Sequence, residues 1–323
     1  MVDQKLRLKT SSVSSAGYYD DLDAYSYSND EIICEITKTL NSIVKNVKRD
    51  SDKRFTIAMT AGLDSRTILS AALKENVPFT TVTMEHDFIS MGDIKLPNTL
   101  SSEFGYTHNY IPRIKELNKA KHYEFKAFCF NQVNDADALF YAHGQFSRIS
   151  DQSILIRGGM WELGRDYYPE LKECFINGDL PYSRFPILRS SRFHYWSLTY
   201  WRKSKLESGV AENISNLFYL EQRIGCWLSA VEHSISITGI SSIHVANCPL
   251  IIKNLLILST KNLPKNHIQL EIIKKNRAEL LDYKINPSYP LHDFRTKLKL
   301  LISIGFKTFV QKVLDKILRA AFK

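Results

Sequence analysis

Cysteine is scarce in this sequence, and the short motifs that mark many catalytic sites are absent. The five cysteines are widely spaced and include no Cys-x-x-Cys pair. This usage argues against a zinc or iron–sulfur centre and favours reduced thiols in a cytosolic compartment. The sequence also lacks HExxH, GxSxG, GxGxxG and the Walker phosphate loop. A phosphate-binding site in this chain would therefore need a different kind of loop.

Long apolar runs are missing as well. No uninterrupted apolar stretch approaches the ~18 residues that a bilayer-spanning helix needs. The N-terminus shows no apolar signal region. Hydrophobic residues make up 44% of the chain and charged residues 24%, a balance that excludes large-scale disorder. We therefore expect a globular protein with a cytoplasmic location.

Acidic residues are scarce in the last segment of the chain. The net charge is +9, and residues 295–323 hold eight basic residues but a single acidic one, Asp315. Apolar residues recur there at helical spacings, which predicts a basic amphipathic helix over residues 293–323. Three interpretations stay open: peripheral contact of residues 294–323 with the inner membrane surface, contact with nucleic acid, or packing on the preceding helices with the lysines in water.

The central feature of the sequence is the stretch of residues 54–76. Apolar residues alternate over positions 55–59, as in a buried strand, and recur at helical spacing over positions 68–73. Between them lies the segment TAGLDS, residues 60–65. A strand that enters a helix through such a turn points backbone N–H groups and the positive end of the helix dipole at one spot. This arrangement predicts a phosphate-binding loop.

The loop resembles that of the ATP pyrophosphatases of the asparagine synthetase type, in which Ser-Gly-Gly-x-Asp-Ser holds the pyrophosphate end of ATP. The six matching positions here are Thr60, Ala61, Gly62, Leu63, Asp64 and Ser65. The resemblance implies ATP and Mg²⁺ as cofactors, with the Asp64 carboxylate facing the metal. It also implies an α/β fold with a parallel-sheet, adenine nucleotide alpha-hydrolase-like core (PP-loop, Rossmann-like) and a helical C-terminal part. Ala61 departs from the pattern, because alanine tolerates positive φ poorly.

A second element of that family, Ser-Gly-x-Gly-x-Asp-Glu after a strand, is partly matched by residues 154–168. Gly158 and Gly159 would form the turn near the ribose and α-phosphate, and Glu162 matches the closing glutamate. Arg157 and Trp161 stand where the family has Ser and Asp. These departures leave the identity of the substrate more open than ATP binding.

Three further site predictions concern charge and the adenine base. Arg165 either forms a structural pair with Glu162 or holds an acidic substrate or a leaving phosphate. The resemblance implies that the backbone of the strand ending at Val82 and Met84 recognises adenine. Cations that neutralise the leaving pyrophosphate are expected on the opposite wall, and three candidates by position are Lys274, Lys275 and Arg277.

The resemblance divides the chain into four parts. They are a polar N-terminal arm over residues 1–29, an ATP pyrophosphatase core over 30–168, a helical synthetase-like region over 169–292 and the basic tail over 293–323. Helices are predicted over 30–48, 93–104, 216–233, 249–259 and 266–281, and strands over 80–84, 108–111 and 154–156. Residues 170–202 combine aromatic and basic side chains. They are predicted to form an irregular connection between helices, with stacking on bases or sugars as the alternative.

These features predict an ATP-dependent ligase that forms an amide through an acyl-adenylate. The acceptor would be a small-molecule or sugar carboxylate, and it is not expected to be aspartate. No glutaminase domain fits before residue 54, so ammonia or an amine would be the nitrogen donor, brought in some cases by a partner protein. Two alternatives stay open: a non-catalytic scaffold with a decayed ATP site, and an RNA-modifying enzyme of the same superfamily. A nucleic-acid partner is disfavoured because cysteine pairs are missing and the basic charge is concentrated in the tail.

Overall fold

The computed structural model describes residues 4–7, 12–15, 27–49, 52–86, 89–112, 119–130, 149, 153–165, 167–179, 181, 188, 191–236, 240–261 and 263–289 of the 323-residue chain. The predicted basic tail, residues 293–323, lies outside these ranges. Within them, no helix combines the length and the apolar character needed to cross a membrane.

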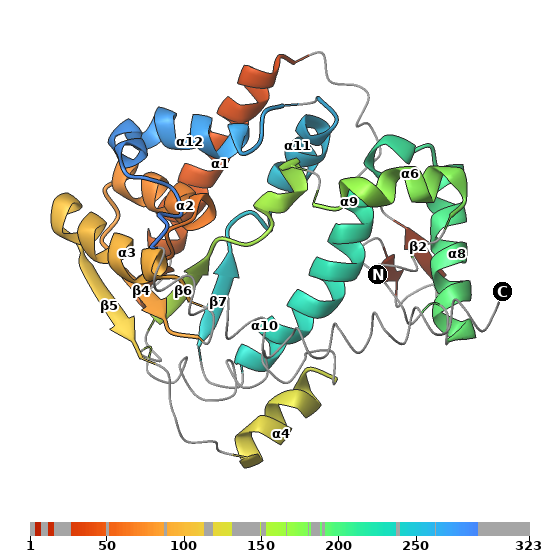
Figure 1. The fold of residues 1–323 in the computed structure, drawn as a ribbon, viewed down its shortest axis with the longest axis horizontal. Helices are drawn as coiled ribbons and strands as arrows, with labels where there is room; N and C mark the ends of the chain where they lie inside the picture. The colour runs from red at the N-terminus through yellow and green to blue at the C-terminus, as the bar shows by residue number, and fades with distance from the viewer. Residues whose placement is uncertain are drawn as a thin grey trace.

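A parallel five-stranded sheet organises the fold (Figure 1). Its strands, in spatial order, are β5 (Thr107–Ile111), β4 (Thr80–Met84), β3 (Arg54–Ala58), β6 (Ser153–Arg157) and β7 (Ser241–His244). The central strand β3 pairs with β4 on one side and with β6 on the other. The predicted α/β class with a parallel, Rossmann-like sheet and a helical C-terminal part is confirmed.

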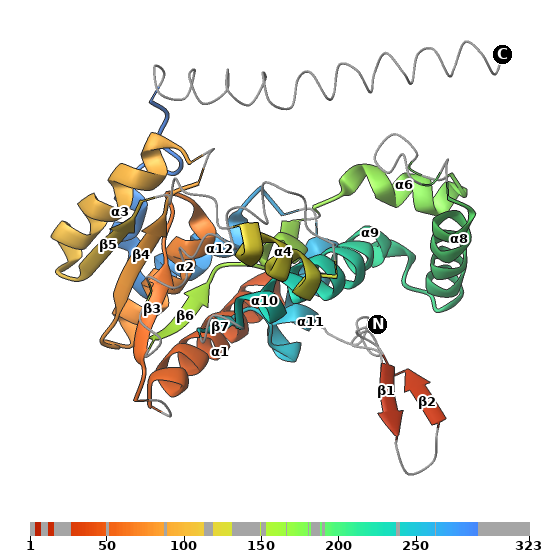
Figure 2. The ribbon, with the colours of Figure 1, turned by 90° about the horizontal axis from the view of Figure 1, so that it is seen from below.

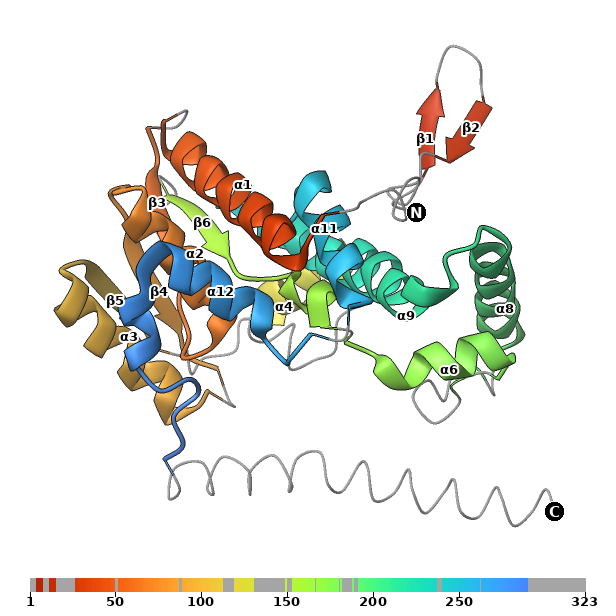
Figure 3. The same ribbon diagram turned by 90° about the horizontal axis from the view of Figure 1, so that it is seen from above.

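Four helices cover one face of the sheet (Figure 3). They are α1 (Asn29–Arg49), α2 (Leu63–Lys74), α11 (Pro249–Ser259) and α12 (His267–Arg277). The alternating residues Phe55 and Ile57 of β3 point to this side and join the largest apolar cluster of the described residues. The apolar stripe of α1, which includes Ile36 and Leu40, packs into the same cluster and fixes the helix to the sheet.

The opposite face carries α10 (Ser229–Ser236) and α4 (Lys119–Phe128). Val82 and Leu155 point to this side and pack with Val231 and Ile235 of α10. A further helix, α3 (Met91–Phe104), lies beside β4 and β5. It begins with a capping box formed by Ser90 and Asp93 and ends at Gly105 in the left-handed conformation.

Two helices extend the molecule away from the sheet (Figure 2). They are α6 (Pro169–Asn177) and α8 (Arg192–Glu207), followed by the short helices η4 (Ala211–Asn213) and α9 (Ile214–Phe218). The prediction of an irregular connection over residues 170–202 is therefore wrong for residues 170–177 and 192–202, which are helical. Local signals explain both helices: α6 begins with a proline in its first turn, and the Ser191 side chain caps α8.

The structure adds strands that the sequence patterns did not predict. In the N-terminal arm, β1 (Gln4–Arg7) pairs antiparallel with β2 (Ser12–Ser15). The edge strand β7 was also missed. The predicted helix over residues 216–233 is present, but its middle is the π-helix η5 (Tyr219–Leu228), between α9 and α10. The boundaries of the four predicted parts remain predictions.

Candidate functional site

The chain changes direction across the sheet between β3 and β6. From β3 it proceeds to β4 and β5 on one side, whereas β6 leads to β7 on the other. In open parallel sheets, ligands bind beyond the carboxyl ends of the strands at such a point, because the connections leave in opposite directions and open a crevice. The loop of residues 60–65 follows β3, and Gly158 follows β6. The topology thus brings together the two segments that the sequence analysis selected.

The loop after β3 is held by hydrogen bonds among its own residues. The N–H of Thr60 donates to Oγ of Ser65 at 3.2 Å, and the N–H of Gly62 donates to Oγ1 of Thr60 at 3.3 Å. Helix α2 begins at Leu63, and the residue at its N-cap, Gly62, has no side chain to cap it. The first-turn N–H groups of α2 are therefore left for a ligand, and the helix dipole favours an anionic one.

The backbone of Ala61 is anchored to the protein on both sides. Its N–H donates to Oδ1 of Asp93 at 2.7 Å, and its carbonyl accepts from the guanidinium of Arg66 at 3.3 Å and from the N–H of Asn286 at 3.1 Å. Asp93 was predicted only as the start of a helix. A role for the Ala61 N–H as a donor to phosphate would require its bond to Asp93 to open.

Two glycines let the end of β6 approach its neighbours closely. A Cβ atom at Gly158 would lie 2.9 Å from the carbonyl carbon of Asp64 and 3.0 Å from the backbone nitrogen of Ser65. A Cβ atom at Gly159 would lie 2.5 Å from Nδ1 of His244. The first contact is with the backbone of the first turn of α2, so only glycine allows the two predicted motifs to meet.

Asp64 lies at the centre of a polar network. Its Oδ1 accepts from Nε2 of Gln269 at 3.1 Å, and its Oδ2 lies 3.4 Å from the guanidinium of Arg165. The same guanidinium lies 3.7 Å from Oε1 of Glu162 and donates to Oδ1 of Asn266 at 2.9 Å. Of the three residues predicted to carry chemistry, Arg165 thus lies next to both Asp64 and Glu162.

Burial raises the pKa of Asp64 to about 6, and the nearby charge of Glu162 adds to the rise, while Arg165 and Gln269 oppose it. The ordinary value for the group is 3.8. The folded protein therefore holds this proton more tightly than the unfolded chain does. Ionised Asp64 destabilises the ligand-free protein, and this cost is absent near pH 4 and complete above about pH 6 to 7.

The raised pKa of Asp64 makes Asp64→Asn a test of this cost. We expect the variant to match the wild type in free energy of unfolding at pH 4 and to exceed it by on the order of 1 to 2 kcal/mol at pH 7, after allowance for solvent screening. Urea unfolding of both proteins at the two pH values gives the difference. A difference that stays constant between pH 4 and pH 7 would contradict the assignment.

Two cavities open on either side of Asp64, which lines both of them together with Tyr167. The first has a volume of about 350 Å³ and lies between the loop, the end of β6 and η5. Predicted residues that line it are Thr60, Asp64, Ser65, Gly158, Gly159 and Glu162. The second has a volume of about 500 Å³, and the predicted residues at its edge are Gly62, Leu63, Asp64 and Arg165.

The second cavity has the features of a site for a polyanion. The first turn of α2 contributes Gly62 and Leu63, and Lys265 and Asn266 directly precede α12. The first turns of these two helices are joined by the bond from Gln269 to Asp64, so both positive helix ends lie beside this cavity. Arg165 and Lys265 add two cationic side chains. This arrangement suits pyrophosphate.

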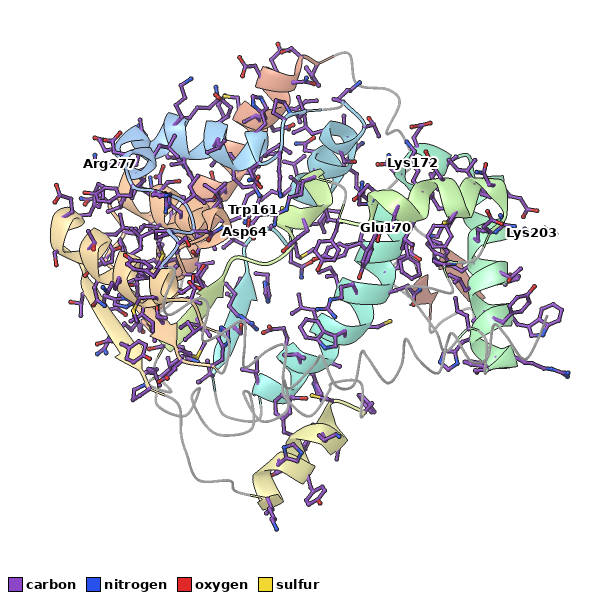
Figure 4. The ribbon with its side chains drawn as sticks, in the orientation of Figure 1. Asp64, Trp161, Glu170, Lys172, Lys203 and Arg277 are labelled. Carbon is purple, nitrogen blue, oxygen red and sulfur yellow. The ribbon has the colours of Figure 1, made fainter. Side chains whose placement is uncertain are left out.

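The cations predicted on α12 lie elsewhere. Lys274, Lys275 and Arg277 are near Glu271, Asp30 and Glu279 at 3.8, 3.9 and 3.8 Å, and they line neither cavity. Figure 4 shows Arg277 well away from Asp64. The lysine that lines the second cavity is Lys265. Sequence position alone could not find it, because it lies in the turn before α12 and not on the helical face.

The residues predicted to recognise adenine are also outside these cavities. Val82 packs in the apolar cluster beneath α10, and its carbonyl accepts the N–H of Met59 at 2.8 Å. Met84 packs at the edge of the same cluster. Neither lines either cavity. Their role in adenine recognition stays a prediction.

Glu162 is the second buried carboxylate of the first cavity. Its Oε2 has no hydrogen-bond partner among the described residues. Burial, together with the nearby charge of Glu162, holds the pKa of Tyr219 well above its usual range. An orphaned buried carboxylate oxygen beside Asp64 fits a cation. The described residues contain no cluster of three or more His, Cys, Asp or Glu side chains arranged for a metal. A Mg²⁺ ion here would therefore need oxygens from a phosphate ligand and water.

The π-helix η5 builds the far wall of the first cavity. Tyr219, Arg223 and Trp227 all line it, at a spacing of four residues. The guanidinium carbon of Arg223 lies 3.8 Å from the ring centroid of Trp227, a cation–π contact. The longer turn of a π-helix keeps side chains four and five residues apart on one side, and such segments occur often at functional sites.

Arg157, which departs from the family pattern, has a structural partner. It forms an ion pair with Glu232 of α10, and Oε1 of Glu232 also hydrogen-bonds Nε2 of His244 at 3.0 Å. Burial alone would raise the pKa of Glu232, but the hydrogen bond from His244 and the charge of Arg157 outweigh it and lower the pKa. These three half-buried residues connect the ends of β6 and β7 to α10. Neither Glu232 nor His244 was predicted, since they become neighbours only through β7.

No protein-family model matches the chain, and no curated protein matches it. Among solved structures, the chain is similar to NMN synthetase from Francisella tularensis, with 19% identity and a TM-score of 0.27 over 43% of this chain and 59% of that one. It is also similar to the U34-tRNA thiolase NcsA from Methanococcus maripaludis, with 11% identity and a TM-score of 0.31 over 86% of this chain and 89% of that one. The chain thus spans little more than half of the NMN synthetase. At these values neither likeness bears on function, and the interpretation of the site depends on its own geometry.

Proposed function

We propose that the chain is an ATP-dependent ligase that forms an amide through an acyl-adenylate. The observation that carries the proposal is the second cavity, where the uncapped N-terminus of α2, the start of α12, Arg165 and Lys265 surround a space next to Asp64. Two helix ends and two cations are a strong combination for the pyrophosphate end of a nucleotide.

The first cavity would hold the reacting end of the nucleotide and the acceptor. Gly158 and Gly159 would allow close approach to the ribose and the α-phosphate, and Thr60 and Ser65 line the same cavity. The side chains of Tyr219, Arg223 and Trp227 leave a wall with both apolar and cationic character for an acceptor acid. A small-molecule or sugar carboxylate suits such a wall.

The chemistry requires mainly positioning and charge stabilisation. A carboxylate oxygen of the acceptor would attack the α-phosphorus, the bond to the β-phosphate oxygen would break, and pyrophosphate would leave into the second cavity. Ammonia or an amine would then attack the acyl carbon and release AMP. Arg165 is placed to stabilise the negative charge that develops on the leaving group, because it lies between Asp64 and Asn266 at the edge of that cavity.

Mg²⁺, when bound with the nucleotide, would neutralise charge on the phosphate oxygens. Asp64 and Glu162 would hold it, since their carboxylates lie on either side of Arg165 and one Glu162 oxygen has no hydrogen-bond partner among the described residues. A cation would favour the ionised form of Asp64. Binding of the metal–nucleotide complex should therefore weaken as the pH falls below about 6, the pKa of that group.

The test is titration calorimetry of the purified chain with ATP–Mg²⁺. We expect the wild type to bind and Asp64→Asn to bind at least tenfold more weakly, because the amide removes the charge that faces the metal. Asp30→Asn is the matched control, since Asp30 is an exposed acid on α1 that lines neither cavity, and it should bind as the wild type does. A wild type that does not bind at millimolar nucleotide would contradict the proposal and favour a non-catalytic scaffold.

A further inference from the structure

Helix α8 exposes a row of aromatic side chains. Phe193, Trp196 and Tyr200 follow one another at helical spacing and are 75%, 67% and 78% exposed. The opposite face of the helix is the packed one: Leu198 is buried there, and Nε1 of Trp201 donates to Glu221 at 2.6 Å. Large aromatic residues gathered on one outward face mark an interaction surface more often than single exposed ones do.

The row lies at the end of the molecule. α8 and α6 form an extension beyond the sheet and its covering helices, and α8 is the outer of the two (Figures 1 and 2). In Figure 4 the labelled Lys203 of α8 points outward, on the side of the molecule away from Asp64. The aromatic face is therefore separate from both cavities.

The charge around the row is basic. Arg192 precedes it and Lys203 follows it, and both are exposed. Of the acids of α8, only Glu207 is present, and it lies 3.8 Å from Lys203. Aromatic rings flanked by Arg and Lys match the boundary of an anionic bilayer, where the rings enter the headgroup region and the long cationic side chains reach the lipid phosphates.

We propose that the α8 face, defined as Arg192, Phe193, Trp196, Tyr200 and Lys203, binds the surface of an anionic lipid bilayer. The inference stands apart from the proposed ligase function. It places the chain at a membrane surface, and none of the described helices is long and apolar enough to cross that membrane.

The size and charge of the α8 face favour a lipid bilayer over a second copy of the chain and over a nucleic acid. Three aromatic side chains exposed by about 70% offer on the order of 400 Å², whereas a stable protein dimer needs about 800 Å² from each partner. A symmetric pair of α8 faces would also bring like charges together. A nucleic acid would gain stacking on the rings, but its affinity depends on several cations that contact phosphates, and α8 presents two on this face. A bilayer needs neither matched shape nor many cations.

The test is flotation of the full chain with vesicles of phosphatidylcholine alone and with about 30% phosphatidylglycerol added. We expect binding to the anionic vesicles and at least tenfold weaker partitioning of the triple variant Phe193→Ser, Trp196→Ser, Tyr200→Ser. The matched control changes the exposed aromatics of the α4 region, Tyr123→Ser, Phe128→Ser and Phe130→Ser, and should bind as the wild type does. Circular dichroism checks that each variant is folded.

A second measurement reports on α8 directly. Vesicles should shift the tryptophan emission of the wild type to shorter wavelength, and Trp196→Phe should remove most of this shift while binding persists. The proposal is overturned if the wild type does not float, or if the triple variant floats as well as the wild type does. It is also overturned if the triple variant instead loses a dimer seen by sedimentation, or loses binding to labelled RNA, with vesicle binding unchanged.

Discussion

Replacing Arg66 with Met is expected to lower the free energy of unfolding by about 3 kcal/mol or more. Arg66 is completely buried in the first turns of α2, and its guanidinium donates to four backbone carbonyls. These are the carbonyls of Ala61, Leu280, Tyr283 and Lys284, at 3.3, 3.1, 2.8 and 3.4 Å. Methionine fills similar space but leaves these acceptors without their donor.

The cost is large because Arg66 joins two distant parts of the chain. It ties the loop after β3 to residues 280–284, which follow α12, and no carboxylate among the described residues pairs with it. Burial lowers the pKa of Arg66 to about 10, so the group remains charged at neutral pH. Loss of this clamp should also leave the Ala61 carbonyl with the Asn286 N–H as its remaining donor and weaken any ligand that binds the loop.

Chemical denaturation of Arg66→Met beside Arg54→Met separates the clamp from a general effect of removing an arginine. Arg54 is exposed at the start of β3, so its replacement should change stability by no more than about 0.5 kcal/mol. Arg66→Lys should recover part of the loss, since an ammonium reaches fewer of the four carbonyls. A loss below about 1 kcal/mol in Arg66→Met would refute the clamp.

The parts of the fold that could be predicted from the sequence are those set by neighbouring residues along the chain. The strand, turn and helix of residues 54–76 were recognisable because their apolar periodicities differ on either side of a small-residue turn. The clamp by Arg66 was not, because three of its four partners lie more than two hundred positions away, and all four offer main-chain carbonyls, which leave no trace in residue identity. The same holds for Gln269, which reaches Asp64 only when α12 packs on α2.

Other features were missed because their signal is weak or atypical. β7 has only four residues, two of them serine, so it lacks the β-branched run that identifies a strand. The aromatic residues of α8 obscured its helical pattern because they lie on its exposed face and not on its buried one. The π-helix has the composition of an α-helix and differs only in its turn. Thus the core motif was predictable, whereas the walls of the cavities required the packed structure.

Replacing Gly158 with Ala is the second change with a large expected effect. The added Cβ would lie 2.9 to 3.1 Å from backbone atoms of Asp64 and Ser65, and the backbone cannot move aside as a flexible side chain can. The end of β6 must therefore separate from the first turn of α2. We expect a loss of about 1 to 3 kcal/mol in the free energy of unfolding. We also expect at least a tenfold loss in affinity for ATP–Mg²⁺, since the end of β6 and the loop before α2, which together form the site, would move apart.

Gly62→Ala provides the matched control for stability. Gly62 has φ −78°, which any residue adopts, and a Cβ there would meet its nearest neighbour, Oγ1 of Thr60, at 3.5 Å. Because alanine is a poorer N-cap residue than glycine, Gly62→Ala should unfold slightly below the wild type, whereas Gly158→Ala should unfold at a clearly lower temperature. If both variants unfold like the wild type, β6 and α2 do not meet as closely as described. If Gly158→Ala loses stability but keeps its affinity for ATP–Mg²⁺, the nucleotide does not use the junction of the two motifs. The pair of variants therefore distinguishes the architecture of the site from its proposed ligand.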